Sequence, residues 1–149
     1  MSETATQRIL VHATPERCLE VALDFERYPE WASDIKDCHV LSRDLEGRGN
    51  EVEYRAAAMG RSTTYVLRYN HGTNPLRLSW RLMRGDLMRQ LDGEYEFAES
   101  VDEPGATDVT YYLAVDLQVP LPGFVKRRAE ARIMHTALLE LKARAESDL

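Results

Sequence analysis

Apolar and polar residues alternate along the middle of the chain, from about Ile35 to Leu117. Turn-forming residues interrupt this alternation five times, at 45–49, 59–60, 71–75, 85–86 and 102–107. Alternation places neighbouring side chains on opposite faces of a strand. Short loops make successive strands antiparallel neighbours, so the pattern predicts six strands joined as a meander.

The segment before this region predicts one strand and one helix. A short apolar run at 8–12 fits a strand, and Thr14-Pro15-Glu16 has the form of a helix start. The threonine caps, the proline takes the first helical position and the glutamate favours the positive end of the helix dipole. Apolar residues at helical spacing continue toward Phe25, and Pro29 should end or break this helix near Tyr28.

The segment after the meander predicts the longest helix, from about 124 to 145, following Pro120-Leu121-Pro122-Gly123. Its main apolar stripe is expected to pack on the concave face of the sheet, and contains Ala131, Met134, Leu138, Leu141 and Ala145. A second stripe, Val125, Ala129 and Ile133, needs another protomer or a neighbouring loop to cover it. Strands in a run predict an α+β fold, and residues 1–149 are expected to form one domain.

The alternation separates an apolar face of the sheet from a charged one, on which Arg68, Arg77 and Arg81 should meet solvent. The apolar face and the long helix supply the residues expected to line a ligand cavity: Tyr54, Tyr65, Leu67, Tyr69, Leu78, Trp80, Tyr95, Phe97, Tyr111, Met134 and Leu138. Five of these are tyrosines, and a buried phenol hydroxyl needs a partner. Either the hydroxyls reach solvent at strand ends, or they meet one another, water or a ligand.

Charge and composition narrow the class of protein. The fractions of hydrophobic residues, 44%, and charged residues, 30%, are typical of globular domains, and the net charge of −6 argues against nucleic-acid binding. The cluster Lys126-Arg127-Arg128 with Arg132 is either a solvated helix face or a contact for an anionic headgroup or an acidic partner. No apolar run is long enough to span a membrane, although a transient membrane contact stays open.

Catalytic and metal-binding signatures are sparse. Cys18 and Cys38 lack metal-ligand spacing, and no secretory signal precedes them, so we expect reduced thiols, a cytoplasmic location, no metal and no cofactor. His39 and His135 are candidates for acid–base chemistry if they reach the interior. Glu130 is a third candidate, because a carboxylate at the edge of an apolar cavity has a raised pKa.

The order of elements and three local motifs resemble the polyketide cyclase/dehydrase and coenzyme Q-binding branch of the START-like superfamily. The motifs are Thr14-Pro15-Glu16, Tyr28-Pro29-Glu30-Trp31, and Leu121-Pro122-Gly123-Phe124 leading into Lys126-Arg127-Arg128. The resemblance covers nearly the whole chain. It implies a helix-grip fold, in which a curved antiparallel sheet of about seven strands surrounds a long C-terminal helix and encloses an apolar cavity.

The resemblance implies several activities, because members of this superfamily include lipid and isoprenoid carriers, hormone receptors and aromatase/cyclases. Binding or carriage of a lipid, isoprenoid quinone or polyketide-like aromatic is the first hypothesis. The second is a polyketide aromatase/cyclase or dehydratase acting in the same cavity. This chain has leucines, tyrosines and phenylalanine where such enzymes often have more polar groups. The third is a protein-interaction module or homodimer without a small ligand, so a monomer and a homodimer both stay open.

Overall fold

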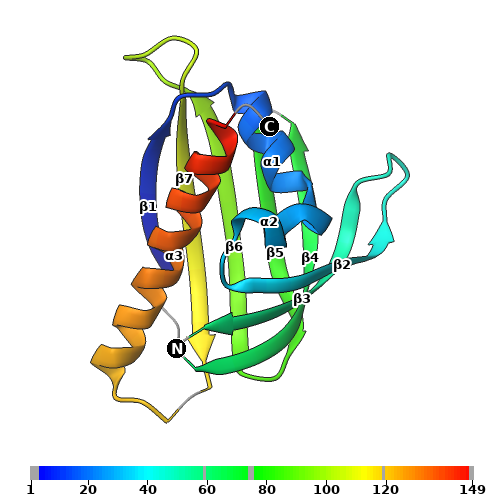
Figure 1. Cartoon of the computed structure of the whole chain (residues 1–149), viewed down its shortest axis with the longest axis vertical. Coiled ribbons are helices and arrows are strands. Elements are labelled where there is room, and N and C mark those ends of the chain that lie inside the picture. The colour runs from blue at the N-terminus through cyan, green and yellow to red at the C-terminus, as the bar shows by residue number, and fades with distance from the viewer. Residues whose placement is uncertain (1–3, 59, 74–75, 119, 148–149) are drawn as a thin grey trace.

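A computed structural model describes residues 4–58, 60–73, 76–118 and 120–147 of the chain (Figure 1). The first strand is β1 (Thr4–Val11), and three helical segments follow it: α1 (Pro15–Leu23), η1 (Phe25–Arg27) and α2 (Tyr28–Trp31). The next elements are strands: β2 (Ile35–Arg43), β3 (Gly49–Ala58), β4 (Arg61–Thr73), β5 (Leu76–Gly85), β6 (Met88–Glu99) and β7 (Thr107–Leu117). The last element is α3 (Gly123–Ala145).

The seven strands form one antiparallel sheet in the order β1-β7-β6-β5-β4-β3-β2. Strands β2 to β7 are a meander, and β1 pairs with β7, so the predicted α+β class and strand order are confirmed. The sheet curves around the helices (Figure 1). Helix α3 contacts β1, β7 and α1, whereas α1 contacts β5 and β6 and η1 contacts β2. The helices therefore cover the concave face.

Helix α1 begins where the sequence predicts it. The Thr14 hydroxyl accepts a hydrogen bond from the Arg17 backbone N–H at 3.1 Å, and Pro15 opens the helix. The helix ends earlier than expected, because the backbone leaves the helical region at Asp24 (φ −83°, ψ 67°). The expectation that Pro29 ends the helix is wrong, since Pro29 lies in the first turn of α2.

Replacing the Thr14 cap is expected to weaken α1. Thr14→Ala leaves one backbone N–H of the first turn without its partner, which should lower the free energy of unfolding by about 1 kcal/mol. Urea titration followed by circular dichroism measures this change. Thr14→Ser keeps a hydroxyl acceptor and should retain the wild-type midpoint, so equal losses for both variants would contradict a capping role.

One strand boundary and one face assignment differ from expectation. Residues 71–73 belong to β4 and are not part of a turn, while 59, 74 and 75 lie outside the described residues. Val66 was expected to meet solvent but is 1% exposed. It lies between Glu53 and Arg84 on the neighbouring strands, whose long side chains are able to cover it.

Helix α3 buries Met134, Leu138, Leu141 and Ala145, as its main stripe predicts. Ala131 is exposed, so its place in that stripe is wrong, and Ala129 is buried instead. This difference arises because α3 lies against β1, an edge strand of the sheet. The Gln7 side chain in β1 donates to the Ala131 carbonyl, and Ile133 packs against the core. Residues 129 and 133 of the second stripe are therefore covered within this chain.

Candidate ligand site

The eleven residues expected to line a cavity all lie on the concave face of the sheet or on the side of α3 that faces it. Ten of them are buried, and Tyr65 is partly buried. Arg68, Arg77 and Arg81 lie on the opposite face and are exposed, as the alternation predicts. The structure thus brings the predicted lining residues together in one region between the sheet and the helices.

Aromatic rings form a connected network across this region. On the helical side, Trp31 contacts Tyr28 at 4.8 Å between ring centroids, and Tyr28 contacts Phe25 and Tyr54. On the sheet side, Trp80 contacts the rings of three tyrosines at 5.3–5.9 Å: Tyr69, Tyr95 and Tyr111. Phe25 joins the two sides by its 4.5 Å contact with Tyr69. Of the chain's aromatic residues, Phe124 and Tyr112 stand outside this network.

The phenol hydroxyls of the network fall into two groups. The Tyr54 and Tyr69 hydroxyls bond each other, and the Tyr28 hydroxyl donates to the Ala22 carbonyl. The hydroxyls of Tyr65, Tyr95 and Tyr111 make no hydrogen bond with the described residues. The Trp80 indole N–H also makes no hydrogen bond with a described residue.

The side chains of Trp80, Tyr95 and Tyr111 are buried, and that of Tyr65 is half-buried. A donor on a buried side chain that lacks a protein partner needs water or a ligand to satisfy it. The four donors therefore mark the part of the network where a ligand's oxygen atoms would fit.

Burial keeps the ionisable groups of this region neutral. It raises the pKa of Tyr28, Tyr54, Tyr65, Tyr69, Tyr95 and Tyr111 above the usual phenol value, and raises the pKa of the Cys38 thiol to about 12. The cause in each case is the cost of removing a charge from water. The site thus offers apolar ring surface with neutral hydroxyl and N–H groups.

Gly93 makes room for the central indole of the network. It pairs with Trp80 across β5 and β6, and a methyl group at Gly93 would lie 2.5 Å from a ring carbon of Trp80 and 2.8 Å from the Tyr112 carbonyl. No side chain fits in that space without displacing the indole or the backbone. Glycine at this position therefore lets Trp80 lie against the sheet.

The candidate acid–base residues do not gather in this region. His39 and His135 are exposed, so the expectation that they reach the interior is wrong. His39 alternates with the inward Cys38, and His135 points away from the side of α3 that buries Met134. Glu130 is half-buried on the first half of α3 and has an interaction partner. Its catalytic role stays a prediction.

Buried polar side chains among the described residues are Ser100, Thr107 and Thr110, and none of the buried side chains carries a charge. Within the same residues, no group of His, Cys, Asp and Glu side chains is placed to hold a metal ion. Two residues of the region were missed by pattern alone. Tyr28 was read as part of a helix exit, and His71 as part of a turn. The His71 Nε2–H donates to the Gly49 carbonyl at 2.8 Å, which leaves its Nδ1 as an enclosed acceptor.

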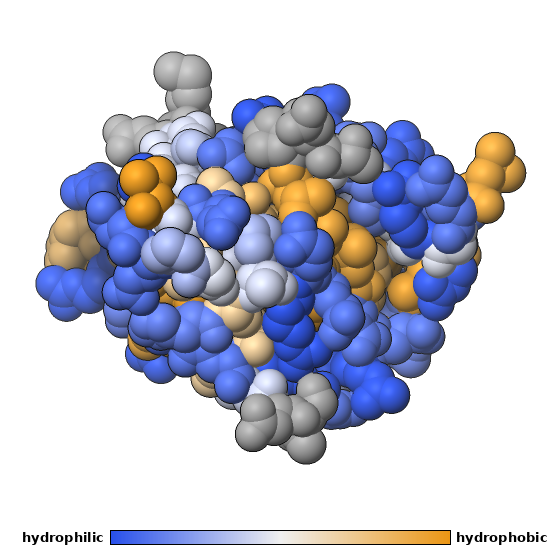
Figure 2. Space-filling view, turned by 90° about the horizontal axis from the view of Figure 1, so that it is seen from above, coloured by the Kyte–Doolittle hydropathy of each residue, from blue (hydrophilic) through white to orange (hydrophobic). Residues whose placement is uncertain are grey.

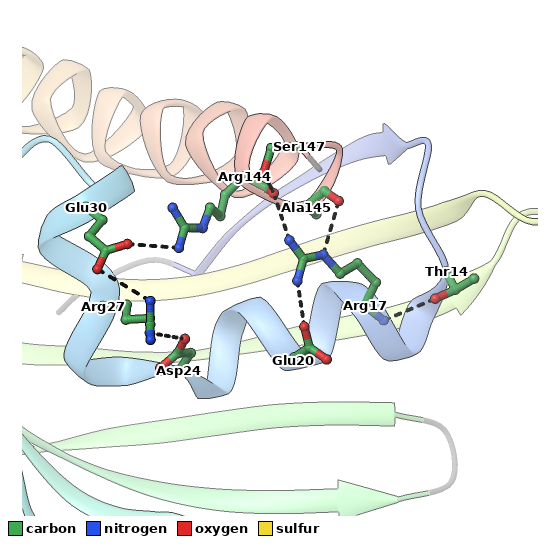
Figure 3. Close-up of polar contacts among 9 residues, drawn as sticks. All are labelled: Thr14, Arg17, Glu20, Asp24, Arg27, Glu30, Arg144, Ala145 and Ser147. Atoms are coloured by element: carbon green, nitrogen blue, oxygen red, sulfur yellow. Dashed lines mark hydrogen bonds and ion pairs between the residues drawn. The ribbon is translucent and has the colours of Figure 1, made fainter. Parts of the chain in front are cut away.

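A groove of about 880 Å³ lies between α1, η1 and α2 on one side and the end of α3 on the other, and Figure 3 shows the charged side chains along it. Ion pairs follow it: Arg27 with Asp24 and Glu30, and Glu30 with Arg144 at 3.0 Å. Arg17 donates to the carbonyls of residues 144 and 145 at the end of α3. Trp31 lines this groove and contacts Tyr28, so it connects the groove to the aromatic network.

The end of the molecule that carries α1 and the end of α3 is mostly hydrophilic when seen from above, and apolar side chains show between the hydrophilic ones (Figure 2). The groove beside α1 is lined largely by charged side chains that pair with one another. Apolar side chains line the groove as well, namely Leu19, Val21, Leu23 and Trp31, but the donors without a partner among the described residues lie in the aromatic network. We therefore take the network as the candidate ligand site and the groove as its outer border.

Solved structures with the same fold cover nearly the whole chain. A START superfamily protein from Mycobacterium smegmatis is 22% identical, with a TM-score of 0.87 over 96% of this chain and 97% of the other. An aromatase/cyclase from Streptomyces is 14% identical, with a TM-score of 0.83 over 98% and 94%. A protein from Thermus thermophilus is 21% identical, with a TM-score of 0.79 over 96% and 97%. At these identities the likeness shows a shared fold.

A family model described as polyketide cyclase/dehydrase and lipid transport matches residues 2–146. No curated protein sequence matches the chain. Within the described helices, none is both long and apolar enough to cross a membrane. The helix-grip architecture and the family match agree with the resemblance indicated by Thr14-Pro15-Glu16 and by Leu121-Pro122-Gly123-Phe124. The chain therefore belongs to the polyketide cyclase/dehydrase and lipid transport family.

Proposed function

We propose that this protein, acting as one domain over residues 1–149, binds and carries a hydrophobic small molecule between its sheet and its helices. The observation that supports this most is the aromatic network with four unpartnered donors, on Tyr65, Trp80, Tyr95 and Tyr111. A core that only stabilised the fold would favour phenylalanine at these positions, because an unpartnered hydroxyl adds a desolvation cost and no packing.

The chemistry of the site limits the ligand. Ring faces favour a flat or aromatic molecule by stacking, and hydroxyl and N–H donors favour carbonyl or ether oxygens. No buried side chain in the described residues carries a charge that would balance an anion or a cation. The ligand is therefore a neutral, largely apolar molecule with a few acceptor oxygens, a class that contains isoprenoid quinones and polyketide-like aromatics.

The alternative function is a polyketide aromatase/cyclase or dehydratase acting in the same site. A structural relative from Streptomyces is named an aromatase/cyclase, and the family description includes cyclases and dehydrases. Such an enzyme needs a group that moves protons near the substrate. The exposed positions of His39 and His135 leave Glu130 and neutral phenols for that task, which favours carriage over catalysis.

The third hypothesis, a homodimer without a ligand, loses its main reason because Ala129 and Ile133 are covered within the chain.

Native mass spectrometry of the purified protein, followed by organic extraction, tests the proposal. We expect a population heavier than the bare chain, and a neutral apolar compound released into the organic phase. A bare mass from several expression hosts, together with no uptake of added quinones or aromatic polyketides, would contradict carriage. Conversion of an added polyketide to a cyclised or dehydrated product would favour the enzyme.

A further inference from the structure

Three connections of the sheet meet at the end of the molecule opposite α1, and α3 begins there (Figure 1). The turn between β5 and β6 is hydrogen-bonded to the segment near the start of β4 and to the segment just after β7. The Thr64 backbone N–H, near the start of β4, donates to the Asp86 carboxylate at 3.3 Å. The Gln118 backbone N–H, just after β7, donates to the Leu87 carbonyl at 2.7 Å. We call this region, with residues 123–132 of α3, the basic end.

The basic end holds cations that lack acidic partners. The seven are Arg61, Arg84, Arg89, Lys126, Arg127, Arg128 and Arg132. None of them forms an ion pair with a described residue. On the outer face of the sheet, Arg55, Arg68 and Arg77 each pair with a carboxylate on the neighbouring strand, whereas Arg81 forms no ion pair with a described residue. The chain as a whole has a net charge of −6, so these unpaired cations stand out against an acidic protein.

Three of the four cations on α3 also oppose the stability of their own helix. A helix carries partial positive charge at its N-terminus, where acidic side chains are favourable and basic ones are not. The first turn of α3 has no acidic residue, and Pro122 provides no side-chain cap. Lys126, Arg127 and Arg128 therefore repel the helix terminus. Their presence is explained better by an external anion than by folding.

Exposed apolar side chains accompany these cations. Phe124 is 61% exposed and lies one turn from the exposed Arg127 and Arg128 on the same side of α3. Met83, 43% exposed, precedes Arg84 near the turn between β5 and β6. Three other exposed apolar residues have acidic neighbours, namely Leu45 beside Asp44 and Glu46, Val101 before Asp102, and Leu139 before Glu140, while Leu41 lies between Val40 and Ser42. Apolar exposure and unpaired positive charge thus coincide at the basic end.

We propose that the basic end docks on a membrane surface that contains anionic lipids, with the cations on the headgroups and Phe124 inserted among them. Cations beside an exposed aromatic ring match the interface of a charged bilayer, where each basic residue near the surface strengthens binding and a buried ring adds to it. The acidic loop between β6 and β7 lies at the other end and faces water (Figure 1). This docking goes beyond the proposed function, and its test needs no ligand.

Sedimentation with lipid vesicles tests the proposal. Vesicles of phosphatidylcholine with about one third phosphatidylglycerol should bind the protein at least about tenfold more strongly than pure phosphatidylcholine vesicles, and about 0.5 M NaCl should abolish the difference. The variant K126Q/R127Q/R128Q/R132Q should bind anionic vesicles about 600-fold more weakly, since each of the four cations contributes about fivefold. Phe124→Ser should weaken binding about tenfold, because it removes the inserted ring while keeping every charge.

The matched control is R43Q/R55Q/R68Q/R77Q, which removes the same number of charges from ion-paired positions elsewhere. It should keep the wild-type affinity to within about threefold. Circular dichroism should show both quadruple variants folded. Equal binding to neutral and anionic vesicles, or equal losses in both quadruple variants, would overturn the proposal. Binding to an acidic protein without binding to anionic vesicles would also overturn it and would assign the basic end to a protein partner.

Discussion

Replacing Tyr65, Tyr95 and Tyr111 together by phenylalanine should weaken ligand binding about a hundredfold while leaving the protein at least as stable as the wild type. Each hydroxyl lacks a protein partner, so its removal leaves no orphaned group behind. Loss of three hydrogen bonds to a ligand, at about 0.5–1.5 kcal/mol each, gives the expected loss of affinity. Titration with Nile red, a neutral aromatic dye whose one carbonyl oxygen accepts one or two of these bonds, should show about a tenfold loss, and thermal unfolding measures stability.

The matched control for this variant is Tyr54→Phe. The Tyr54 and Tyr69 hydroxyls bond each other in the buried part of the network. Removing one of them leaves the other without a partner, so Tyr54→Phe should lower the free energy of unfolding by about 1–3 kcal/mol and change dye affinity little. If the triple variant loses stability instead of affinity, its hydroxyls are structural and the proposed ligand contacts are wrong.

Gly93→Ala should destabilise the protein by about 3 kcal/mol, because the added methyl group overlaps the Trp80 indole and approaches the Tyr112 carbonyl. The indole has to move, so dye binding should weaken as well. Chemical unfolding measures the stability, and the fluorescence of Trp80 in a Trp31→Phe background reports the displacement. Gly123→Ala adds the same methyl group where it meets only the tip of Arg127, so its effect should stay within about 0.5 kcal/mol. A wild-type unfolding midpoint for Gly93→Ala would contradict the packing of Trp80 described above.

Alternation along the strands was sufficient to predict which side chains point to the concave face of the sheet. Trp80 and Tyr95 point inward because every second residue of a strand does, and this holds without knowledge of the neighbouring strands. The same rule failed at Val66, because burial on the outer face depends on the long side chains of Glu53 and Arg84 on the neighbouring strands.

Contacts between distant segments set the rest of the site. Tyr28 joins the network because α1 ends at Asp24 and the following residues place η1 and α2 over the sheet. An aspartate within a helical pattern does not predict that the helix ends there. The pairing of the Tyr54 and Tyr69 hydroxyls could not be predicted from the sequence either. Tyr54 lies directly opposite Tyr65 in the register of β3 and β4, yet its hydroxyl bonds that of Tyr69, four residues further along β4.

Helix α3 shows the limit of helical spacing. Apolar residues occur on both sides of the helix, so spacing alone assigned Ala131 to the buried stripe and left Ala129 outside it. The contact of α3 with β1 decides between these positions, since the Gln7 side chain binds the Ala131 carbonyl while Ala129 is buried. Which face of a helix is buried depends on the neighbour it meets, and that neighbour here is 124 residues away in the chain.

A crystal structure of the protein soaked with Nile red tests the central claim most directly. The account predicts electron density for the dye between the sheet and the helices, against the rings of Trp80, Tyr95 and Tyr111, with its carbonyl oxygen within hydrogen-bond distance of a free donor. Density for the dye on the outer surface alone, with water or packed side chains filling the region around these rings, would contradict it.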